Sequence, residues 1–343
     1  MLRNFLILIL SFVIISLTSC NNGKNDSINE DLLNDTSLTI DELNKLIRQN
    51  PKNADLFIKR SELYLEEKNV EEAINDLEIA LKVDTLKQDI YTRLSDLYLS
   101  VGKSEKAKNI LTLCLYRFPF NVKARVELAK LYLYVQMYSE AMKEILNLEE
   151  NNLQNADSYF VKALILNETE MYDDAIKSLK KTIEYNSNHW EAYNLLGMIY
   201  ARQENPIAME YFNTAVRLFP DNSEIRFDAG YVFQQFGETE KAIAEYSEAI
   251  NLDSLYYQAY FNLGYIYVND LKDYNLALEC FNAAINCDTS AYKAYYNRGY
   301  TYEMSGNYKK AETDYRKALQ IMPNYDPAVN GLNDVIDKMR VNK

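Results

Sequence analysis

The residues that most often do chemistry in proteins are scarce in this 343-residue sequence, and they do not cluster. The one histidine, His189, stands beside the one tryptophan, Trp190. No cysteine–histidine group has the spacing of metal ligands, and no glycine-rich loop follows a strand. Acidic residues are plentiful but scattered, which is typical of solvated helix faces rather than paired acid–base groups. We predict no catalytic residue, metal site or cofactor, and we expect His189 on the surface of a loop.

The four cysteines, Cys20, Cys114, Cys280 and Cys287, are too few and too irregular for a disulfide framework. Cys280 and Cys287 lie seven residues apart in a helical pattern. Their Cα atoms would be about 10.5 Å apart, beyond the reach of a disulfide. We expect the three cysteines after Cys20 to be small apolar residues in helix contacts.

The charge balance argues against a nucleic-acid partner. The net charge is −13, and no run is rich in lysine or arginine. Binding to phosphates requires clustered positive charge, which this sequence lacks.

Aromatic and amide side chains, by contrast, recur in register and could bind a ligand. Three aromatic pairs, each four residues apart, follow one another at intervals of 34 or 35 residues: Phe227 and Tyr231, Phe261 and Tyr265, Tyr296 and Tyr300. The residue after the first member of each pair is Asp228, Asn262 or Asn297. Aromatic groups anchor peptides, and an amide both donates to and accepts from a backbone. The same pairs also stabilise their own helices, so packing alone is the alternative explanation.

The elements that position these side chains are copies of one repeat. The stretch Tyr292–Tyr325 is its clearest copy, and stepping back from Ala311 finds an alanine every 33 to 35 residues: Ala277, Ala242, Ala208, Ala175, Ala141, Ala107 and Ala73. A fixed period of this size predicts an array of small units instead of one closed globule.

Each unit reads as a helical hairpin, because its apolar residues recur at three- and four-residue steps in two blocks with a short break between them. The clearest copy carries Tyr295, Gly299, Tyr302, Ala311, Tyr315, Ala318 and Pro323. These types and spacings resemble the tetratricopeptide repeat. The resemblance implies an all-α fold, a right-handed superhelical solenoid of hairpins.

Eight such units cover most of the chain: residues 54–87, 88–121, 122–155, 156–189, 190–222, 223–256, 257–291 and 292–325. Residues 38–52 and 326–343 each predict a lone amphipathic helix. We expect both to cap the array, since a terminal unit otherwise exposes an apolar face.

One small residue recurs in the first helix of every unit, where two helices must approach closely. It is Ser61, Ser95, Ala129, Ala163, Gly197, Gly230, Gly264 and Gly299 in turn. The third and fourth units match the pattern least well. Arg125 replaces an aromatic residue, Lys162 an apolar one, and Leu148 and Thr182 the second alanine, so looser packing is expected there.

The resemblance also implies where a partner would bind. In tetratricopeptide proteins the fifth and ninth positions of each unit line the concave side of the superhelix. The aromatic pairs occupy these positions in the last three units, whereas the N-terminal half is acidic and small. Members that bind chaperone C-terminal tails clamp a carboxylate with basic residues here, and only Lys130 is basic at any of the sixteen places. We therefore expect a peptide partner but no chaperone tail.

The N-terminal segment has the features of a secretory leader. One cation, Arg3, precedes an apolar run from Phe5 to Leu17, too short for a membrane span. Leu17-Thr18-Ser19-Cys20 resembles the lipobox of bacterial lipoproteins, which implies that residues 1–19 are removed and that Cys20 carries lipid. Residues 20–37 are polar and acidic, as in a flexible tether. The residue after the cysteine is not aspartate, which favours the outer membrane.

Taken together, these features favour a lipid-anchored adaptor of the cell envelope that holds another protein in its groove, and no enzyme. Similar lipoproteins act as pilotins for secretion or pilus assembly, or recruit cell-wall enzymes. The alternative is a lipoprotein that binds a glycan or small ligand through the groove aromatics. The sequence identifies neither the partner nor the oligomeric state.

Overall fold

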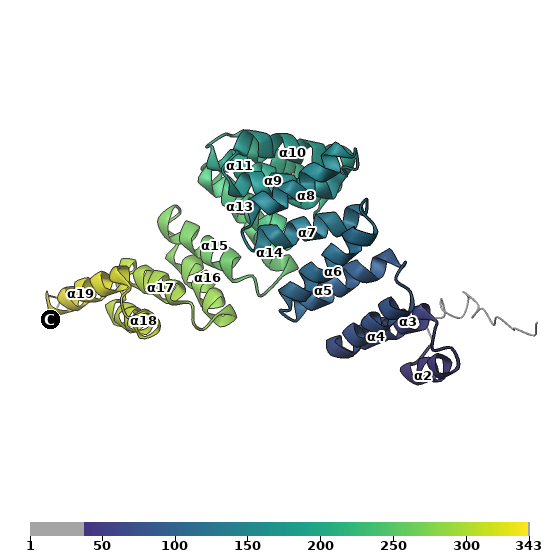
Figure 1. Cartoon of the computed structure of the whole chain (residues 1–343). Helices are drawn as coiled ribbons and strands as arrows, with labels where there is room; N and C mark the ends of the chain where they lie inside the picture. Colours follow the sequence, from purple (N-terminus) through teal and green to yellow (C-terminus); the bar gives the residue numbers. More distant parts are fainter. Residues whose placement is uncertain (1–37, 342–343) are drawn as a thin grey trace, which may run out of the picture. The chain divides into compact units, whose positions relative to one another are not determined.

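The computed structural model describes residues 38–341, and within them the chain is entirely helical, with 18 helices and no strand (Figure 1). The predicted leader, Cys20 and the tether fall outside the described residues. The chain divides into two compact units between Lys103 and Ser104. The all-helical fold is confirmed, while the right-handed sense of the superhelix stays a prediction.

The first unit contains α2 (Ile40–Gln49), α3 (Ala54–Glu66), α4 (Val70–Val83) and α5 (Gln88–Ser100), each packed on the next. A capping box starts α2, because Thr39 accepts a bond from the backbone of Glu42 and the Glu42 carboxylate accepts one from the backbone of Thr39. Leu43 of α2 is fully buried. The single helix before the first repeat is thus fixed at its start and through its apolar side.

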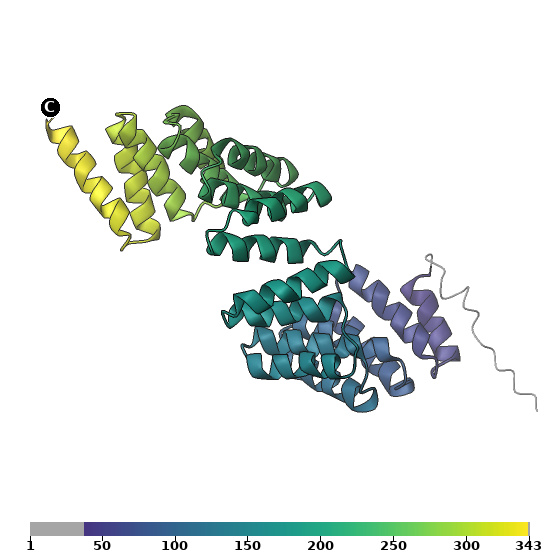
Figure 2. The same cartoon turned by 90° about the horizontal axis from the view of Figure 1, so that it is seen from above.

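The second unit consists of α6, six hairpins and a final helix. Its helices are α6 (Ser104–Arg117), α7 (Val122–Tyr134), α8 (Tyr138–Glu150), α9 (Ala156–Glu168), α10 (Tyr172–Tyr185), α11 (Trp190–Arg202), α12 (Ile207–Leu218), α13 (Ser223–Gln235), α14 (Thr239–Leu252), α15 (Tyr257–Asn269), α16 (Tyr274–Cys287), α17 (Tyr292–Met304), α18 (Tyr308–Ile321) and α19 (Asp326–Val341). Each helix packs on the next in the chain, and successive helices run antiparallel (Figure 2). No helix in the described part of the chain is long and apolar enough to cross a membrane.

Every hairpin turn is made by one residue in the left-handed region. Glycine takes this place at Gly102, Gly237 and Gly306, with φ between 72° and 79°. The other five hairpins use residues with a side chain at φ between 54° and 61°: Lys68, Gln136, Glu170, Glu204 and Lys272. Glycine adopts this conformation without the steric cost that other residues carry. The turn geometry is therefore imposed by the hairpin and not by glycine alone.

The small residue of each first helix lies where the two helices of a hairpin cross, and we call it the crossing residue. A Cβ added at Gly197, Gly230 or Gly264 would stand 2.5–2.7 Å from a ring of the second helix, and one at Gly299 would stand 3.0 Å away. The rings belong to Phe212, Tyr246, Phe281 and Tyr315. At Gly197, Gly230 and Gly264 there is no room for a methyl group unless the facing ring shifts, and at Gly299 the fit would be tight.

The first helices of the second unit lie on the inner side of its stack. Among the described residues, α7 contacts α9, α11 contacts α13, and α15 contacts α17, whereas successive second helices make no comparable contact. Units that lie closer together on one side form a stack curved toward that side. We infer that side chains on the open faces of α11, α13, α15 and α17 line the concave side of the second unit, and we call this the concave surface.

The looser packing expected of the third and fourth repeats is seen in one of them: α7 and α8 of the third repeat contact each other less extensively than α9 and α10 of the fourth. Arg125 is paired with Glu144 at 2.5 Å and donates to the carbonyl of Pro119, and Lys162 pairs with Glu149 at 2.6 Å. Leu148 and Thr182 are fully buried. The two basic departures thus have ion-pair partners and the other two are buried, while the Nε of Arg125 is buried without a hydrogen-bond partner.

Candidate functional site

The first members of the three aromatic pairs are packing residues. Phe227 on α13, Phe261 on α15 and Tyr296 on α17 each contact the aromatic ring that faces their own crossing residue. The centroid distances are 5.6 Å to Tyr246, 6.0 Å to Phe281 and 5.7 Å to Tyr315. Ring pairs at this separation add stability beyond the area they bury.

A second ring holds each of these residues from the other side. Phe227 stacks on Tyr256 at 5.1 Å, and Tyr296 meets Tyr325 edge-on at 5.4 Å. Both tyrosines come from the loop that leads into the next helix. For Phe261 the second contact is Tyr257, at 6.0 Å in the same helix. The fifth-position rings are thus fixed inside the wall of the concave surface and are poorly placed to grip a partner by themselves.

The second members of the pairs differ, because two of them project into solvent. Tyr231 is 45% exposed and Tyr265 is 44% exposed. Tyr300 is half-buried against the clusters around Tyr315 and Phe281. Tyr231 and Tyr265 are thus exposed, and each lies one turn along its helix from a ring that is fixed by packing.

The polar residues at the sixth position do not form a uniform ladder. Asp228 accepts a hydrogen bond from the Nδ2 of Asn194 on α11, at 2.6 Å. Asn262 donates to the hydroxyl of Tyr246, at 2.9 Å, and Asn297 donates to the carbonyl of Lys293 in its own helix, at 2.8 Å. Each side chain thus has a different partner. The row predicted from sequence as three equivalent groups is three distinct polar sites.

Burial and hydrogen bonding set the electrostatics of this surface. Burial raises the pKa of Asp228, against the opposing effect of the bond from Asn194. Burial also raises the pKa of Tyr256 to about 12 and that of Tyr246 further still. The tyrosines are therefore neutral hydrogen-bonding groups at physiological pH, and the surface carries an incompletely solvated carboxylate.

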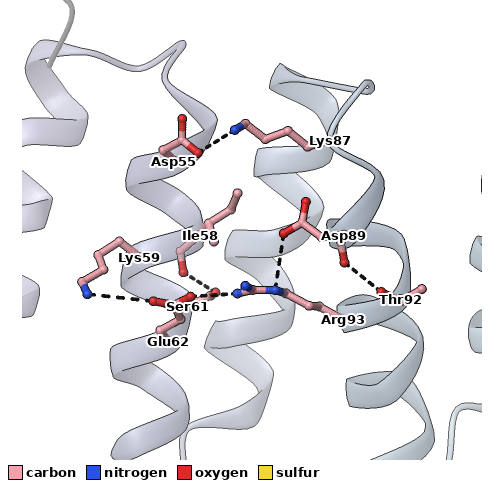
Figure 3. A network of polar contacts seen from close by, with 9 residues as sticks. All are labelled: Asp55, Ile58, Lys59, Ser61, Glu62, Lys87, Asp89, Thr92 and Arg93. Carbon is pink, nitrogen blue, oxygen red and sulfur yellow. Dashed lines mark hydrogen bonds and ion pairs between the residues drawn. The ribbon is translucent and has the colours of Figure 1, made fainter. Parts of the chain in front are cut away.

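The corresponding face of the first unit is a network of paired charges (Figure 3). Lys87 bridges to Asp55 at 2.7 Å, and Arg93 contacts both Glu62 at 2.8 Å and Asp89 at 3.5 Å. The N-terminal half was predicted to be acidic, but these acidic groups are matched by basic ones on neighbouring helices. Exposed pairs of this kind contribute little to stability, and a partner would have to displace them to bind.

His189 is not on the surface, which corrects the sequence-based expectation. It is 9% exposed, it immediately precedes α11, and its ring lies 4.4 Å from that of Phe160 on α9. Its Nδ1 stands 3.1 Å from a carboxylate oxygen of Glu191, but the geometry is not that of a hydrogen bond. The imidazole is buried because the loop that leads into α11 packs against Phe160 of α9.

Two polar triads, each built on a buried aspartate, escaped the sequence analysis. Arg60 holds Asp76 in a two-pronged ion pair at 2.6 and 2.7 Å and donates to Asn44. Arg298 holds Asp314 in the same way, with both bonds at 2.7 Å, and donates to Asn282. In both triads the three residues lie 16 apart along the chain, so an arginine at this spacing from an aspartate was the available signal. The triads join helices and leave no free group for a ligand.

Asn194 was also missed as a site residue, since it occupies a fifth position with no aromatic ring. Within residues 38–341, no group of three or more histidine, cysteine, aspartate or glutamate side chains is placed to hold a metal ion. Cys114 is buried, and Cys280 and Cys287 are half-buried, all three as free thiols. The chemistry available on the concave surface is that of recognition through rings, amides and a carboxylate.

Family models match this chain in several places. Tetratricopeptide repeat models match residues 88–121, 162–223, 257–288 and 292–325, and a TPR repeat model matches residues 230–270. The matched segments contain both helices of several hairpins and include the clearest copy of the repeat.

Solved structures show the same fold. The Cut9–Hcn1 hetero-tetramer of the APC/C superimposes with a TM-score of 0.56 at 20% identity, covering 86% of this chain and 58% of that one. The C-terminal part of a TPR repeat-containing protein from Cytophaga hutchinsonii has a TM-score of 0.57 at 16% identity and covers 70% and 98%. At these identities the likeness concerns the fold alone.

A curated relative matches over a shorter stretch. The probable UDP-N-acetylglucosamine–peptide N-acetylglucosaminyltransferase SPINDLY of Hordeum vulgare is 25% identical over 152 residues, which is 42% of this chain but 16% of that protein. The chain thus spans less than a fifth of the relative's length. The repeats form a scaffold suited to protein–protein interaction, and the chain belongs to the tetratricopeptide repeat proteins.

Proposed function

We propose that the protein is an adaptor that binds an extended peptide or a helix of another cell-envelope protein along the open faces of α13, α15 and α17. The observation that carries this proposal is the exposure of Tyr231 and Tyr265, at 45% and 44%, above rings that are themselves fixed by packing. The fold does not need these two side chains for its own core.

Tyrosine is well suited to this role. It offers a large, stiff surface at a low cost in conformational entropy, and it is enriched among the residues that dominate binding energy. The backing rings restrict movement of the helix faces that carry Tyr231 and Tyr265. A partner would therefore meet a preorganised surface, which reduces the entropy lost on binding.

The test is co-purification of partners with variants of the full chain. We expect Tyr231→Ala with Tyr265→Ala to weaken binding about 100-fold, at roughly tenfold for each anchor. Adding Tyr300→Ala should abolish it, but Tyr300 is half-buried, so the double variant is the safer measure. The matched control is Tyr116→Ala, Phe120→Ala and Tyr134→Ala, three aromatic side chains that are at least 66% exposed on other parts of the second unit.

The control should retain the partner. Equal loss in both sets, or no loss in either, would remove the concave surface from the account. Retention of the wild type on a peptidoglycan or polysaccharide column, lost in the tyrosine variant, would favour a glycan-binding lipoprotein instead.

We further propose that the adaptor is anchored through lipid on Cys20, with the outer membrane as the favoured site. This rests on the leader and on the sequence Leu17-Thr18-Ser19-Cys20, which resembles a lipobox. Two acyl chains give stable anchoring where one does not. The variant Cys20→Ala should appear in the soluble envelope fraction, and continued membrane association would contradict the proposal. No enzymatic activity is proposed.

A further inference from the structure

Asp228 stands out on the concave surface because it is charged, only half exposed and without a cation. It lies on α13, and its one hydrogen-bond donor from another helix is Asn194 on α11, at 2.6 Å. In residues 38–341 no lysine or arginine forms an ion pair with it. Arg226, two residues away in sequence, is turned to Glu245 at 2.7 Å and to the carbonyl of Pro220 at 3.1 Å.

Asp228 and Asn194 together have more hydrogen-bond acceptors than the described residues around them have donors to match. A carboxylate can only accept, so the amide nitrogen of Asn194 must be the atom that faces Asp228. This leaves the Oδ1 of Asn194, which is buried and has no hydrogen-bond partner. A buried acceptor without a donor costs free energy. The Asn194 oxygen is enclosed by the fold, so the acceptor that a partner can reach is the Asp228 carboxylate, which has one donor, Asn194, among residues 38–341.

The charged group that acts on Asp228 is also acidic, so it adds negative charge where Asp228 already has no cation. Glu224, one turn earlier on α13, is close enough to raise the pKa of Asp228 further, after the larger effect of burial. Burial and, after it, the charges of Asp228, Glu224 and Asp253 raise the pKa of Tyr256. The charged groups that act on Asp228 and Tyr256 are thus acidic.

Aromatic rings form the remaining wall. Phe227 precedes Asp228 and stacks on Tyr256, and the exposed Tyr231 lies one turn farther along the same helix. A ring face attracts a cation, by about 0.5–1 kcal/mol at an exposed site and more where water is excluded. A carboxylate beside ring faces is a combination that recognises an ammonium or guanidinium group.

We propose that Asp228, Asn194 and Tyr231 form a subsite for one lysine or arginine side chain of the bound peptide. These two side chains carry only donors, three on lysine and five on arginine, so either can pair with the Asp228 carboxylate, which the hydrogen bond from Asn194 holds in place. The aliphatic stem lies against the rings. This subsite rests on the peptide binding proposed above and adds the charge of the partner at one defined position.

The experiment is a selection of random 12-residue peptides displayed on phage, run against the full chain and against Asp228→Asn. The matched control is Glu240→Gln, which removes an exposed acidic group on α14. We expect wild type and control to select peptides with lysine or arginine at one fixed place relative to an apolar residue. Asp228→Asn should lose that preference. A selected peptide, made synthetically, should bind Asp228→Asn at least tenfold more weakly than it binds the wild type. The same peptide with norleucine or citrulline in place of its lysine or arginine should bind the wild type at least tenfold more weakly than the original peptide does.

The variant is expected to fold. The folded-state pKa of Asp228 is raised, so its contribution to stability is present below the unfolded pKa and is lost as pH rises through the folded value. At neutral pH the ionised group disfavours the fold, and the neutral asparagine removes that cost. A circular dichroism melt at pH 7 checks this before selection.

Two failures are distinguishable. If winners depend on Tyr231 and Tyr265 but show no basic preference, or bind Asp228→Asn equally well, the subsite is overturned and the peptide surface stands. If no peptide is selected, or winners ignore both tyrosines, the proposed function fails and the subsite fails with it.

Discussion

Two regions of the second unit form the same helical hairpin with different residue types where its two helices cross. In the third and fourth repeats, α7–α10, the crossing residues are Ala129 and Ala163, and they share core clusters with the aliphatic Ile145 and Leu179. In the fifth to eighth repeats, α11–α18, the crossing residues are glycines and the facing residues are Phe212, Tyr246, Phe281 and Tyr315. A methyl group lost on one helix is matched by a ring gained on the other.

The exchange keeps the crossing filled but changes the surface beside it. The large facing rings give Phe227, Phe261 and Tyr296 something to pack on. The hydroxyl of Tyr246 also links helices, since it donates to Gln234 and accepts from Asn262, both at 2.9 Å. A facing leucine or isoleucine supplies neither ring nor hydroxyl, and Phe160 of the fourth repeat packs on His189 instead. The sixth to eighth repeats therefore back their concave face with rings of their own second helices.

The largest expected effect is on the crossing of the seventh repeat. Gly264→Ala places a Cβ 2.7 Å from the ring of Phe281, and overpacking of this kind costs about 1–3 kcal/mol. Phe281→Leu alone should also destabilise by about 1–2 kcal/mol, since it leaves a cavity. The double variant recreates the alanine–leucine pair of the fourth repeat. Urea unfolding should show it to be at least 1 kcal/mol more stable than the sum of the singles predicts.

If the losses of stability from Gly264→Ala and Phe281→Leu are additive in the double variant, the two side chains do not compete for the same space. The proposed exchange between glycine–ring and alanine–leucine crossings would then be wrong. Leu276→Ala, at a 39% exposed position of α16, is the control that should change stability little.

A smaller effect is expected from the reverse change in the alanine region. Ala163→Gly should cost about 1 kcal/mol, the ordinary helix-propensity difference, because Leu179 cannot expand into the space. Adding Leu179→Phe should recover part of this loss in the same unfolding assay. If the added ring destabilises further, the fourth repeat is not interchangeable with the glycine repeats.

The smallest effect concerns the hairpin turns. Glu170 in the alanine region has φ of 61°, where Gly237 in the glycine region has φ of 78°. Glu170→Gly relieves the left-handed strain but increases the entropy of the unfolded chain, so a gain of about 0.5 kcal/mol or less is expected. Gly237→Ala should cost about 1 kcal/mol. A thermal melt in which Glu170→Gly is destabilising would show that its side chain, and not its backbone, decides the turn.

The fold was predictable because the repeat pattern depends on local features. The spacing of Gly299, Ala311 and Pro323 is enough to predict a helical hairpin. The first helices of the eight hairpins begin at the residues where the predicted units begin. The site was less predictable. Tyr296 and Tyr300 look alike in sequence, and only the position of Tyr315 and Tyr325 shows that one is a wall residue.

Polar groups were the hardest to anticipate, because their partners lie on other helices. Asn194 and Asp228 are 34 residues apart, and no sequence pattern around either residue predicts the hydrogen bond between them. His189 was misjudged for the same reason, since its burial depends on Phe160. Periodicity identifies which face a residue occupies but not which neighbour satisfies it.

The most direct test of the account is photocrosslinking in cells with a benzophenone amino acid placed at Tyr265 or at Tyr134. Tyr265 lies on the proposed binding surface, and Tyr134, which is 85% exposed, lies at the end of α7. The account predicts a discrete adduct with one other protein from position 265 and none from position 134. The same adducts from both positions, or none from position 265, would contradict it.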